Sequence, residues 1–200
     1  MTGRDELRSR LRAEREHLGA AQRIAAASGV AATLEQLPEF IIDRRVAGYW
    51  AVGGEVPLHL ALTALLARGQ IWHLPVLTGE RALRFAPWQP GAAVAPNRYG
   101  IPEPQVAPAD LVAAEALELV LVPLLGFDRR GHRLGTGGGY YDRSFAFLGG
   151  RERPAQPVLV GIGYSFQEVE AIGAEPWDIR MDFVATEREL IDCMDVRRET

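Results

Sequence analysis

The residues best suited to chemistry are concentrated in one stretch, residues 121–143, which reads LVPLLGFDRRGHRLGTGGGYYDR. It contains four glycines within five residues, at Gly135, Gly137, Gly138 and Gly139. The backbone N–H groups of a loop without side chains can approach an anion closely, as they do in phosphate-binding nests. A helix beginning near Gly139 would add the partial positive charge of its N-terminus. The pattern predicts a phosphate-binding loop, and a glycine-rich surface turn is the alternative.

Charged residues on both sides of this loop support the first interpretation. Arg133 lies just upstream, where it could contact phosphate oxygens, and Asp142 lies just downstream. Mg²⁺ takes few protein carboxylates and relies on substrate phosphates, so Asp142 and Asp178 are candidate magnesium ligands. Asp182 is an alternative to Asp178 as the second ligand. Each could instead be structural, and for Asp128, in the turn FDRRG, we expect a structural role.

A second candidate site surrounds Glu55, which occupies a predicted turn between a strand and a helix. Ligands of open α/β sheets bind at the carboxyl ends of strands, where such a turn lies. A surface carboxylate without a function is the alternative. The chain also has aromatic residues that could line a pocket for a flat heterocycle, namely Tyr49, Trp50, Trp88 and Tyr99. For Tyr49 and Trp50, packing in the core is the default interpretation.

Residues 4–18 are predicted to form an amphipathic helix, with Leu7, Leu11 and Leu18 at helical spacing. Arginines recur on a second face of this helix. These arginines are Arg4, Arg8, Arg12 and Arg15. They are either solvated or directed at phosphates.

The composition excludes several classes of function. All 22 basic residues are arginine, which excludes the lysine of a P-loop and any Schiff-base lysine. The formal net charge of −4 argues against nucleic acid as a partner. The four histidines lack ligand spacing, so we predict no zinc site. No nucleophile elbow or hydrolase triad is present in the sequence.

The rest of the composition indicates a cytoplasmic domain. Two hundred residues, 48% of them apolar, suit one sizeable domain covering residues 1–200. Cys193 is the only cysteine, so no intramolecular disulfide can form. The charged N-terminus is unlike a secretory signal, and no apolar run is long enough to span a membrane.

Hydrophobic patterning predicts strands and helices in alternation. Strands are expected at residues 45–52, 70–75, 117–123, 157–164 and 183–186, with a short one within 81–88. Helices are expected at residues 20–37, 57–68, 140–148 and 166–172, with a short helix or turn at 109–116. The 117–123 strand is the most apolar and is expected to be central. The alternation predicts a mostly parallel sheet with helical crossovers, and the charged C-terminus is expected to be frayed.

Residues 87–110 are rich in proline. Their prolines are expected to exclude regular structure, which makes this segment a long connecting loop within the domain.

The run from Pro123 to Arg143 resembles the motif of the 5-formyltetrahydrofolate cyclo-ligase (5,10-methenyltetrahydrofolate synthetase) family. The shared pattern is Pro, Phe-Asp, Gly, Arg-Leu-Gly, x-Gly-x-Gly and Tyr-Tyr-Asp. Weaker matches extend over nearly the whole chain: RDELR, GGEVPL, IPEP and PWD. The chain departs from the family pattern at Thr136, where many members carry arginine, and at Arg4, which is often lysine.

The resemblance implies an α/β fold of the NagB/RpiA/CoA-transferase type, a three-layer αβα domain with a mostly parallel sheet. It implies ATP- and Mg²⁺-dependent conversion of 5-formyltetrahydrofolate to 5,10-methenyltetrahydrofolate, with release of ADP and phosphate. It also implies small-molecule substrates only and a monomer. The alternatives are a regulatory protein that binds nucleotide or folate without turnover, and another small-molecule enzyme on a related scaffold, such as a sugar-phosphate isomerase.

The resemblance also implies roles for individual residues. Arg133 and Tyr141 would act on the reacting groups, and Asp142 and Asp178 would hold Mg²⁺. Glu55 would accept hydrogen bonds from the pterin-like substrate, with Tyr99 packed against it. The nucleotide would be bound by Arg4, Arg8, Arg133, Gly135, Thr136, Gly137, Gly138, Gly139, Tyr140 and Tyr141.

Overall fold

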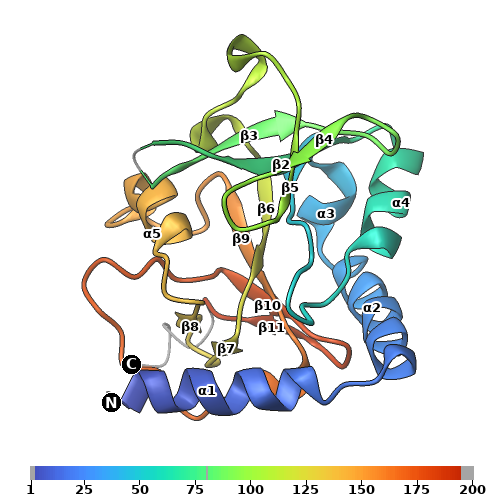
Figure 1. Ribbon diagram of the computed structural model, residues 1–200. Coiled ribbons are helices and arrows are strands. Elements are labelled where there is room, and N and C mark those ends of the chain that lie inside the picture. Colours follow the sequence, from blue (N-terminus) through green and yellow to red (C-terminus); the bar gives the residue numbers. More distant parts are fainter. Residues whose placement is uncertain (1–2, 80, 195–200) are drawn as a thin grey trace.

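A seven-stranded, mostly parallel sheet forms the centre of the protein, as described by a computed structural model covering residues 3–79 and 81–194 (Figure 1). The strand order is β11-β10-β9-β6-β1-β2-β3, and only the edge strands β3 and β11 run antiparallel to their neighbours. The strands are β1 (Arg45–Ala47), β2 (Ile71–Leu77), β3 (Leu83–Pro87), β6 (Leu119–Pro123), β9 (Val158–Ile162), β10 (Phe183–Ala185) and β11 (Leu190–Asp192).

Helices lie on both sides of this sheet. Figure 1 shows α2, α3 and α4 on one side and α5 on the other, while α1 crosses one end. Their bounds are α1 (Gly3–Glu16), α2 (Ala20–Leu34), α3 (Pro38–Ile42), α4 (His59–Ala67) and α5 (Tyr140–Ser144). Short 3₁₀ turns are η1 (Pro108–Asp110), η2 (Ala114–Ala116), η3 (Ala146–Leu148) and η4 (Ser165–Gln167).

The hydrophobic core has one cluster on each face of the sheet. Because strand side chains alternate, Leu119 and Leu121 of β6 pack with α2 and α4, whereas Val120 and Val122 pack with Phe145 beyond α5. All five of these side chains are almost completely buried. A strand that is apolar on both faces is typical of the centre of a parallel sheet, and β6 is the fourth strand of seven, as predicted.

The chain leaves the sheet earlier than expected after the first strand. We predicted a strand over 45–52, but β1 ends at Ala47. A Cβ on Gly48 would lie 2.0 Å from the Trp72 ring, so the backbone passes this bulky side chain only because residue 48 is glycine. The next residues form the turn that carries Glu55, with positive φ at Gly53 and Gly54.

The prediction that residues 87–110 exclude regular structure was wrong. Strands β4 (Val94–Pro96) and β5 (Pro102–Pro104) form an antiparallel hairpin. The flanking hydrogen bonds run from Asn97 to Ile101 and from Gln105 to Ala93, so all three prolines of the hairpin occupy positions that donate no ladder hydrogen bond. Their missing N–H groups therefore cost nothing there.

Other boundaries differ where tertiary contacts decide them. Pro38 begins α3 at its first helical position instead of only ending the helix before it. The predicted helix at 140–148 is divided into α5 and the 3₁₀ turn η3, and the predicted helix at 166–172 is reduced to the 3₁₀ turn η4. Residues 190–192 form β11 against β10, which was not predicted, while the charged end that was expected to fray includes residues 195–200, which lie outside the described part. The small hairpin of β7 (Gly126–Phe127) and β8 (Arg133–Leu134) was not predicted.

Asp43, between α3 and β1, provides a test of the folded state. Burial, with repulsion from Glu118 and Glu39, raises the pKa of Asp43 from 3.8 to about 6. Between these two values the folded protein keeps a proton that the unfolded chain releases, so stability falls as pH rises through this window.

We therefore expect Asp43→Asn to raise the melting temperature by about 1–3 °C near pH 7.5, because Asp43 is only partly buried. Near pH 4 the difference should shrink, since the folded carboxyl is already protonated. Scanning calorimetry at both pH values measures this, with Asp110→Asn at an exposed position as the control. An equal change at both pH values would contradict it.

Candidate functional site

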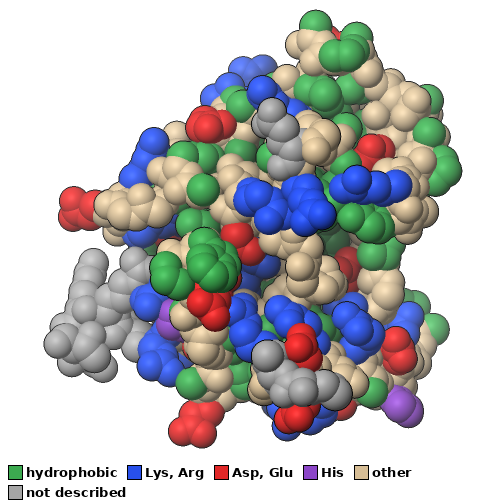
Figure 2. Space-filling model, turned by 60° about the vertical axis from the view of Figure 1, so that its left-hand side comes forward, with side chains coloured by type: hydrophobic (Ala, Val, Ile, Leu, Met, Phe, Trp, Pro, Cys, Tyr) green, Lys and Arg blue, Asp and Glu red, His purple; other side chains and the backbone are tan. Residues whose placement is uncertain are grey.

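A cavity of about 810 Å³ opens at the carboxyl ends of the central parallel strands. Its wall is formed by α1, the turn after β1, the end of β6, the glycine loop, the tip of the β4–β5 hairpin and the segment 175–178. Figure 2 shows arginine side chains on both sides of this hollow. Every residue that the sequence assigned to nucleotide, substrate or metal lines this one cavity.

Arg133 lies directly beside the glycine loop, residues 135–139. The Arg133 side chain is 8% exposed, and its Nη2 donates to Asp142 Oδ1 at 2.7 Å. Its guanidinium also lies 5.7 Å from the centre of the Tyr141 ring. Arg133 Nε is buried and has no hydrogen-bond partner among the described residues. The cation is therefore fixed beside the loop.

Backbone conformation explains why glycine is needed at two positions of the loop. Gly137 has φ of 102° and Gly139 has φ of 64°, both in the left-handed region. Gly139 precedes α5, which has only five residues. The N-terminal dipole expected from a helix over 140–148 is thus limited to one turn, and the arginines supply most of the positive charge.

Two arginines of α1 reach the same loop. Arg8 Nε donates to the carbonyl oxygen of Gly135 at 3.1 Å, and its Nη1 pairs with Asp5 at 2.8 Å. Arg4 Nη1 pairs with Asp178 at 3.1 Å. Both side chains line the cavity, whereas Arg12 is exposed. Arg4 and Arg8 therefore face the cavity, and Arg12 does not.

The two predicted metal ligands lie at the same side of the cavity. Asp142 Oδ1 accepts from the Ile179 N–H at 3.3 Å, which joins the first ligand to the neighbour of the second. Asp178 Oδ2 accepts from Arg4 and from the Glu175 N–H. Among the described residues, no cluster of three or more His, Cys, Asp or Glu side chains could hold a metal ion.

Two other aspartates are structural. Asp182 is fully buried, pairs with Arg153 and accepts the Leu159 N–H, so it is not the second ligand at this cavity. Asp128 is also fully buried and accepts from the backbone of Arg130, His132 and Ile172. The expectation of a structural role for Asp128 is confirmed.

Glu55 lies in the turn after β1 and is half-buried. Its Oε2 accepts the Val52 N–H at 3.1 Å. Burial raises the pKa of Glu55, while that hydrogen bond and the charge of Arg15 oppose the rise. Tyr49 and Trp50 line the cavity beside it, whereas Trp88 packs edge-on against Trp50 with ring centres 5.5 Å apart.

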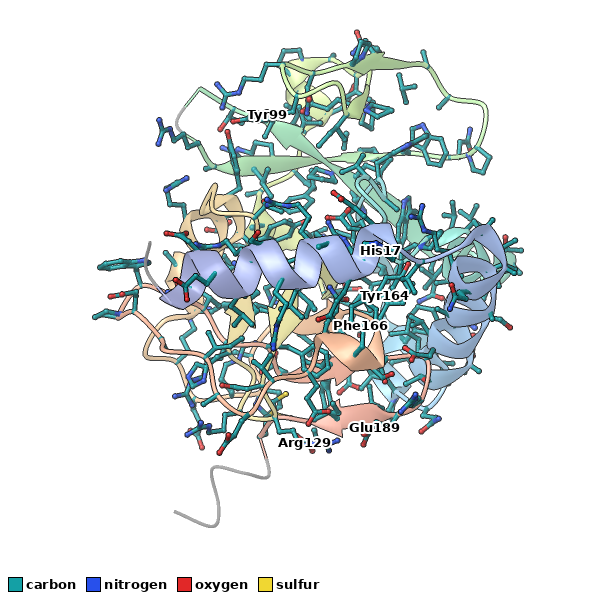
Figure 3. The ribbon with its side chains drawn as sticks, turned by 60° about the horizontal axis from the view of Figure 1, so that its bottom comes forward. His17, Tyr99, Arg129, Tyr164, Phe166 and Glu189 are labelled. Atoms are coloured by element: carbon teal, nitrogen blue, oxygen red, sulfur yellow. The ribbon has the colours of Figure 1, made fainter. Side chains whose placement is uncertain are left out.

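Three side chains cross the mouth of the cavity. The Tyr99 and Tyr140 hydroxyls are 2.9 Å apart, and Arg98 also donates to the Tyr140 hydroxyl. These hydrogen bonds lower the pKa of Tyr140. Tyr99, labelled in Figure 3, is 58% exposed at the hairpin tip. The hairpin β4–β5 is thereby joined to the helix that follows the glycine loop.

Sequence reasoning missed several residues of the wall. Asn97 lines the cavity from the hairpin that was predicted to be irregular, and Trp177, beside Asp178, is a 66% exposed aromatic residue of the wall. Arg98, from the same hairpin, does not line the cavity but donates to the Tyr140 hydroxyl at its mouth. The Pro-Trp-Asp match had singled out this segment without giving Trp177 a role. Arg15, behind Glu55, was assigned only to a helix face.

The geometry is that of an arginine-lined cavity at the strand ends of an α/β protein. Residues 1–187 match the model of the 5-formyltetrahydrofolate cyclo-ligase family. The chain belongs to this family. The 5-formyltetrahydrofolate cyclo-ligase of Haemophilus influenzae is 29% identical over 178 residues, covering 88% of this chain and 93% of that protein.

A second relative and one solved structure support the same conclusion, and a further solved structure supports the fold. The cyclo-ligase of Escherichia coli is 32% identical over 151 residues, covering 74% of this chain and 81% of that protein. The Aquifex aeolicus 5,10-methenyltetrahydrofolate synthetase superposes with a TM-score of 0.80 at 29% identity, covering 96% and 93% of the two chains. The Mycoplasma pneumoniae synthetase, at 21% identity and a TM-score of 0.73, shares the fold and covers 94% of this chain and all of its own.

The contact across the mouth can be tested without substrate. We expect Tyr140→Phe to increase amide hydrogen exchange over residues 97–101, because the tip loses its hydrogen bonds to α5. Tyr141→Phe is the matched control, since the Tyr141 ring stacks on Phe145 away from the tip. Mass-spectrometric exchange measures both variants. Unchanged exchange in Tyr140→Phe would show that the contact does not restrain the hairpin.

Proposed function

We propose that this protein converts 5-formyltetrahydrofolate to 5,10-methenyltetrahydrofolate, using ATP and releasing ADP and phosphate. The observation that carries the proposal is the joint lining of one cavity. Arg133, the glycine loop, Arg4 and Arg8 offer a polyphosphate site, and Glu55 with its aromatic neighbours offers a site for a flat N–H-bearing ring. Membership of the cyclo-ligase family supports the pairing of these two halves.

The reaction does not require a covalent bond between the protein and either substrate. The oxygen of the formyl amide attacks the γ-phosphorus of ATP, and the bond to the ADP oxygen breaks. The resulting imidate phosphate is attacked at its formyl carbon by N10, which loses its proton, and inorganic phosphate leaves with the former formyl oxygen. Catalysis then consists of alignment and of neutralising the charge that develops on phosphate oxygens.

The arginines supply that neutralisation. Arg133 is rigid because it is buried and paired with Asp142, so its guanidinium needs little reorganisation when charge develops. Its Nη1, which lies beside Gly135 of the loop, is the donor offered to a phosphate oxygen. Arg4 and Arg8 approach from α1, and the loop amides of residues 135–139 complete the cradle. Tyr140 and Tyr141 flank it, and Thr136 lies in the loop itself.

The carboxylates fit a magnesium ion held jointly with substrate. Within the described residues, the hydrogen bonds of Asp142 fall on Oδ1 and those of Asp178 on Oδ2. One oxygen of each is left for a cation. A site with few protein carboxylates suits Mg²⁺, which keeps waters and phosphate oxygens as its other ligands. When bound, the ion neutralises charge on the transferring phosphoryl group.

The folate end is assigned to Glu55 and Tyr99. A charged Glu55 accepts hydrogen bonds from the N–H groups of the pterin-like ring, and Tyr99 packs on that ring. Because burial raises the pKa of Glu55, its protonation on acidification should weaken folate binding at a higher pH than for an exposed glutamate.

Replacement of Arg133 tests the phosphate site. Arg133→Ala should lower kcat by about 10² or more, the cost of losing one preorganised contact to the transition state. Arg130→Ala, an exposed arginine three residues away, is the matched control. Turnover is followed by the near-ultraviolet absorbance of the methenyl product, and circular dichroism checks the fold. Near-normal turnover in a folded Arg133→Ala protein would refute the role.

Replacement of the carboxylates tests the cation site. Asp142→Asn and Asp178→Asn should each raise the Mg²⁺ concentration needed for half-maximal turnover, because a neutral amide binds Mg²⁺ less well. Asp182→Asn is the control, since Asp182 pairs with Arg153 and does not line the cavity. A magnesium dependence that is the same in all three variants would contradict the assignment.

The rival functions predict different results in one assay. A regulatory protein, for which Thr136 in place of the common arginine is the argument, would bind ATP tightly and form no product. A sugar-phosphate isomerase would respond to neither ATP nor folate. Incubation with 5-formyltetrahydrofolate, Mg²⁺ and ATP separates these outcomes, and product without ATP would exclude the phosphorylation step.

We also propose that the fold is of the three-layer NagB/RpiA/CoA-transferase type, that residues 1–200 form a single domain, and that the protein is a cytoplasmic monomer. The described part of the chain contains no helix that is both long and apolar enough to cross a bilayer.

A further inference from the structure

Arg15 is the most deeply buried residue on the arginine face of α1. It is 4% exposed, whereas Arg12, one turn earlier, is exposed. Its Nε is buried and has no hydrogen-bond partner among the described residues. Removing a guanidinium from water is costly unless an opposite charge lies nearby. The position of Arg15 therefore requires a counter-charge close to α1.

The segment packed against Arg15 is the turn that carries Glu55. A Cβ placed on Gly53 would lie 3.4 Å from Arg15 Nη2, and one on Gly54 would lie 3.3 Å from Arg15 Cγ. Both glycines have positive φ, 54° and 79°. The absence of side chains lets this turn settle directly on the arginine. Arg15 does not line the cavity, so it lies behind the wall that Glu55 forms.

Two phenols fasten the same turn from other elements. The Tyr164 hydroxyl donates to the Gly54 carbonyl at 3.0 Å, and the Tyr49 hydroxyl donates to the Val56 carbonyl at 2.8 Å. Tyr164 lies beneath the C-terminal end of α1, near His17 (Figure 3). The phenols hold the backbone but carry no charge, because burial raises the pKa of both.

The charge that acts on Glu55 comes from α1. Among the groups facing it, Tyr49, Tyr141 and Tyr164 are neutral, and Arg15 is the cation whose field favours the carboxylate. A second arginine, Arg23 of α2, approaches Gly54 and Tyr164, while Glu187 acts on Tyr164 from the far side. A guanidinium stays protonated in proteins even where burial lowers its pKa, so Arg15 is a permanent charge here.

We propose that Arg15 is a positioning residue for the substrate site: from behind the cavity wall it supports the 53–55 turn and places a cation behind the Glu55 carboxylate. Its consequence for catalysis rests on the proposed contact between Glu55 and the folate ring. Its consequence for the ionisation of Glu55 does not, and the two can be measured separately.

The ionisation is measured on the free protein. The carboxyl ¹³C signals of glutamate-labelled protein are titrated, and the signal of Glu55 is assigned by its loss in Glu55→Gln. Arg15→Met should raise the pKa of Glu55, because an opposing charge is removed. Arg12→Met is the matched control: it removes the same charge from an exposed position, where solvent screens it. Arg15→Lys should keep the pKa close to that of the parent protein.

The catalytic consequence is measured by the pH dependence of turnover. Arg15→Met should raise KM for 5-formyltetrahydrofolate about tenfold near pH 7, the typical effect of weakening a charged hydrogen bond. KM for ATP should change less than about twofold, since the phosphate groups bind elsewhere in the cavity. The acidic limb of kcat/KM for folate should move to higher pH, while Arg12→Met leaves it unmoved.

The outcomes distinguish the possible failures. A Glu55 pKa that does not change in folded Arg15→Met overturns the proposal. Should Arg15→Met fail to fold, Arg15→Lys decides: a Glu55 pKa and folate KM near those of the parent support the proposal, and a large rise in folate KM with an unchanged Glu55 pKa overturns it. A normal folate KM in Glu55→Gln removes the proposed substrate contact but leaves the ionisation result standing.

Discussion

The site depends on ion pairs that hold arginines in place before any ligand binds. Arg133 is buried against Asp142, Arg4 pairs with Asp178, and Arg8 pairs with Asp5 while donating to the loop backbone. Each cation is therefore oriented by a carboxylate on its far side. A polyanion that enters the cavity meets fixed donors and does not have to gather mobile side chains, which lowers the entropic cost of binding.

The fold makes this arrangement possible by collecting strand ends at one edge. Strands β1, β6 and β2 run parallel, so the turn with Glu55, the segment after Pro123 and the start of the β2–β3 connection meet there. Helix α1 then crosses this edge and contributes Arg4 and Arg8 to the cavity wall. The wall of the cavity thus comes from segments far apart in sequence, which the sheet, α1 and the β4–β5 hairpin bring together.

How much the sequence could predict follows from where each signal lies. The apolar run of β6 and the glycine loop are local patterns, and they were located correctly. The hairpin β4–β5 was missed because its prolines fall at positions that need no N–H donor, which only the strand pairing reveals. Asp182 and Asp178 could not be separated by sequence, since pairing with Arg153 is a contact over 29 positions of the chain. The burial of Arg15 could not be predicted either, because its helical spacing is the same as that of the exposed Arg12 and only tertiary packing distinguishes the two.

The absence of lysine is consistent with how the cations are used. Arg133 is 8% exposed, in surroundings that would lower the pKa of a lysine. A guanidinium keeps its charge there and spreads it over a planar group with several donors. Arg133 can thereby bind Asp142 through Nη2 while its Nη1 lies beside the glycine loop at Gly135. A lysine could not serve both partners with the same fixed geometry. Burying a permanent cation behind the glycine loop and another behind Glu55 lets charge act on the cavity without occupying its volume.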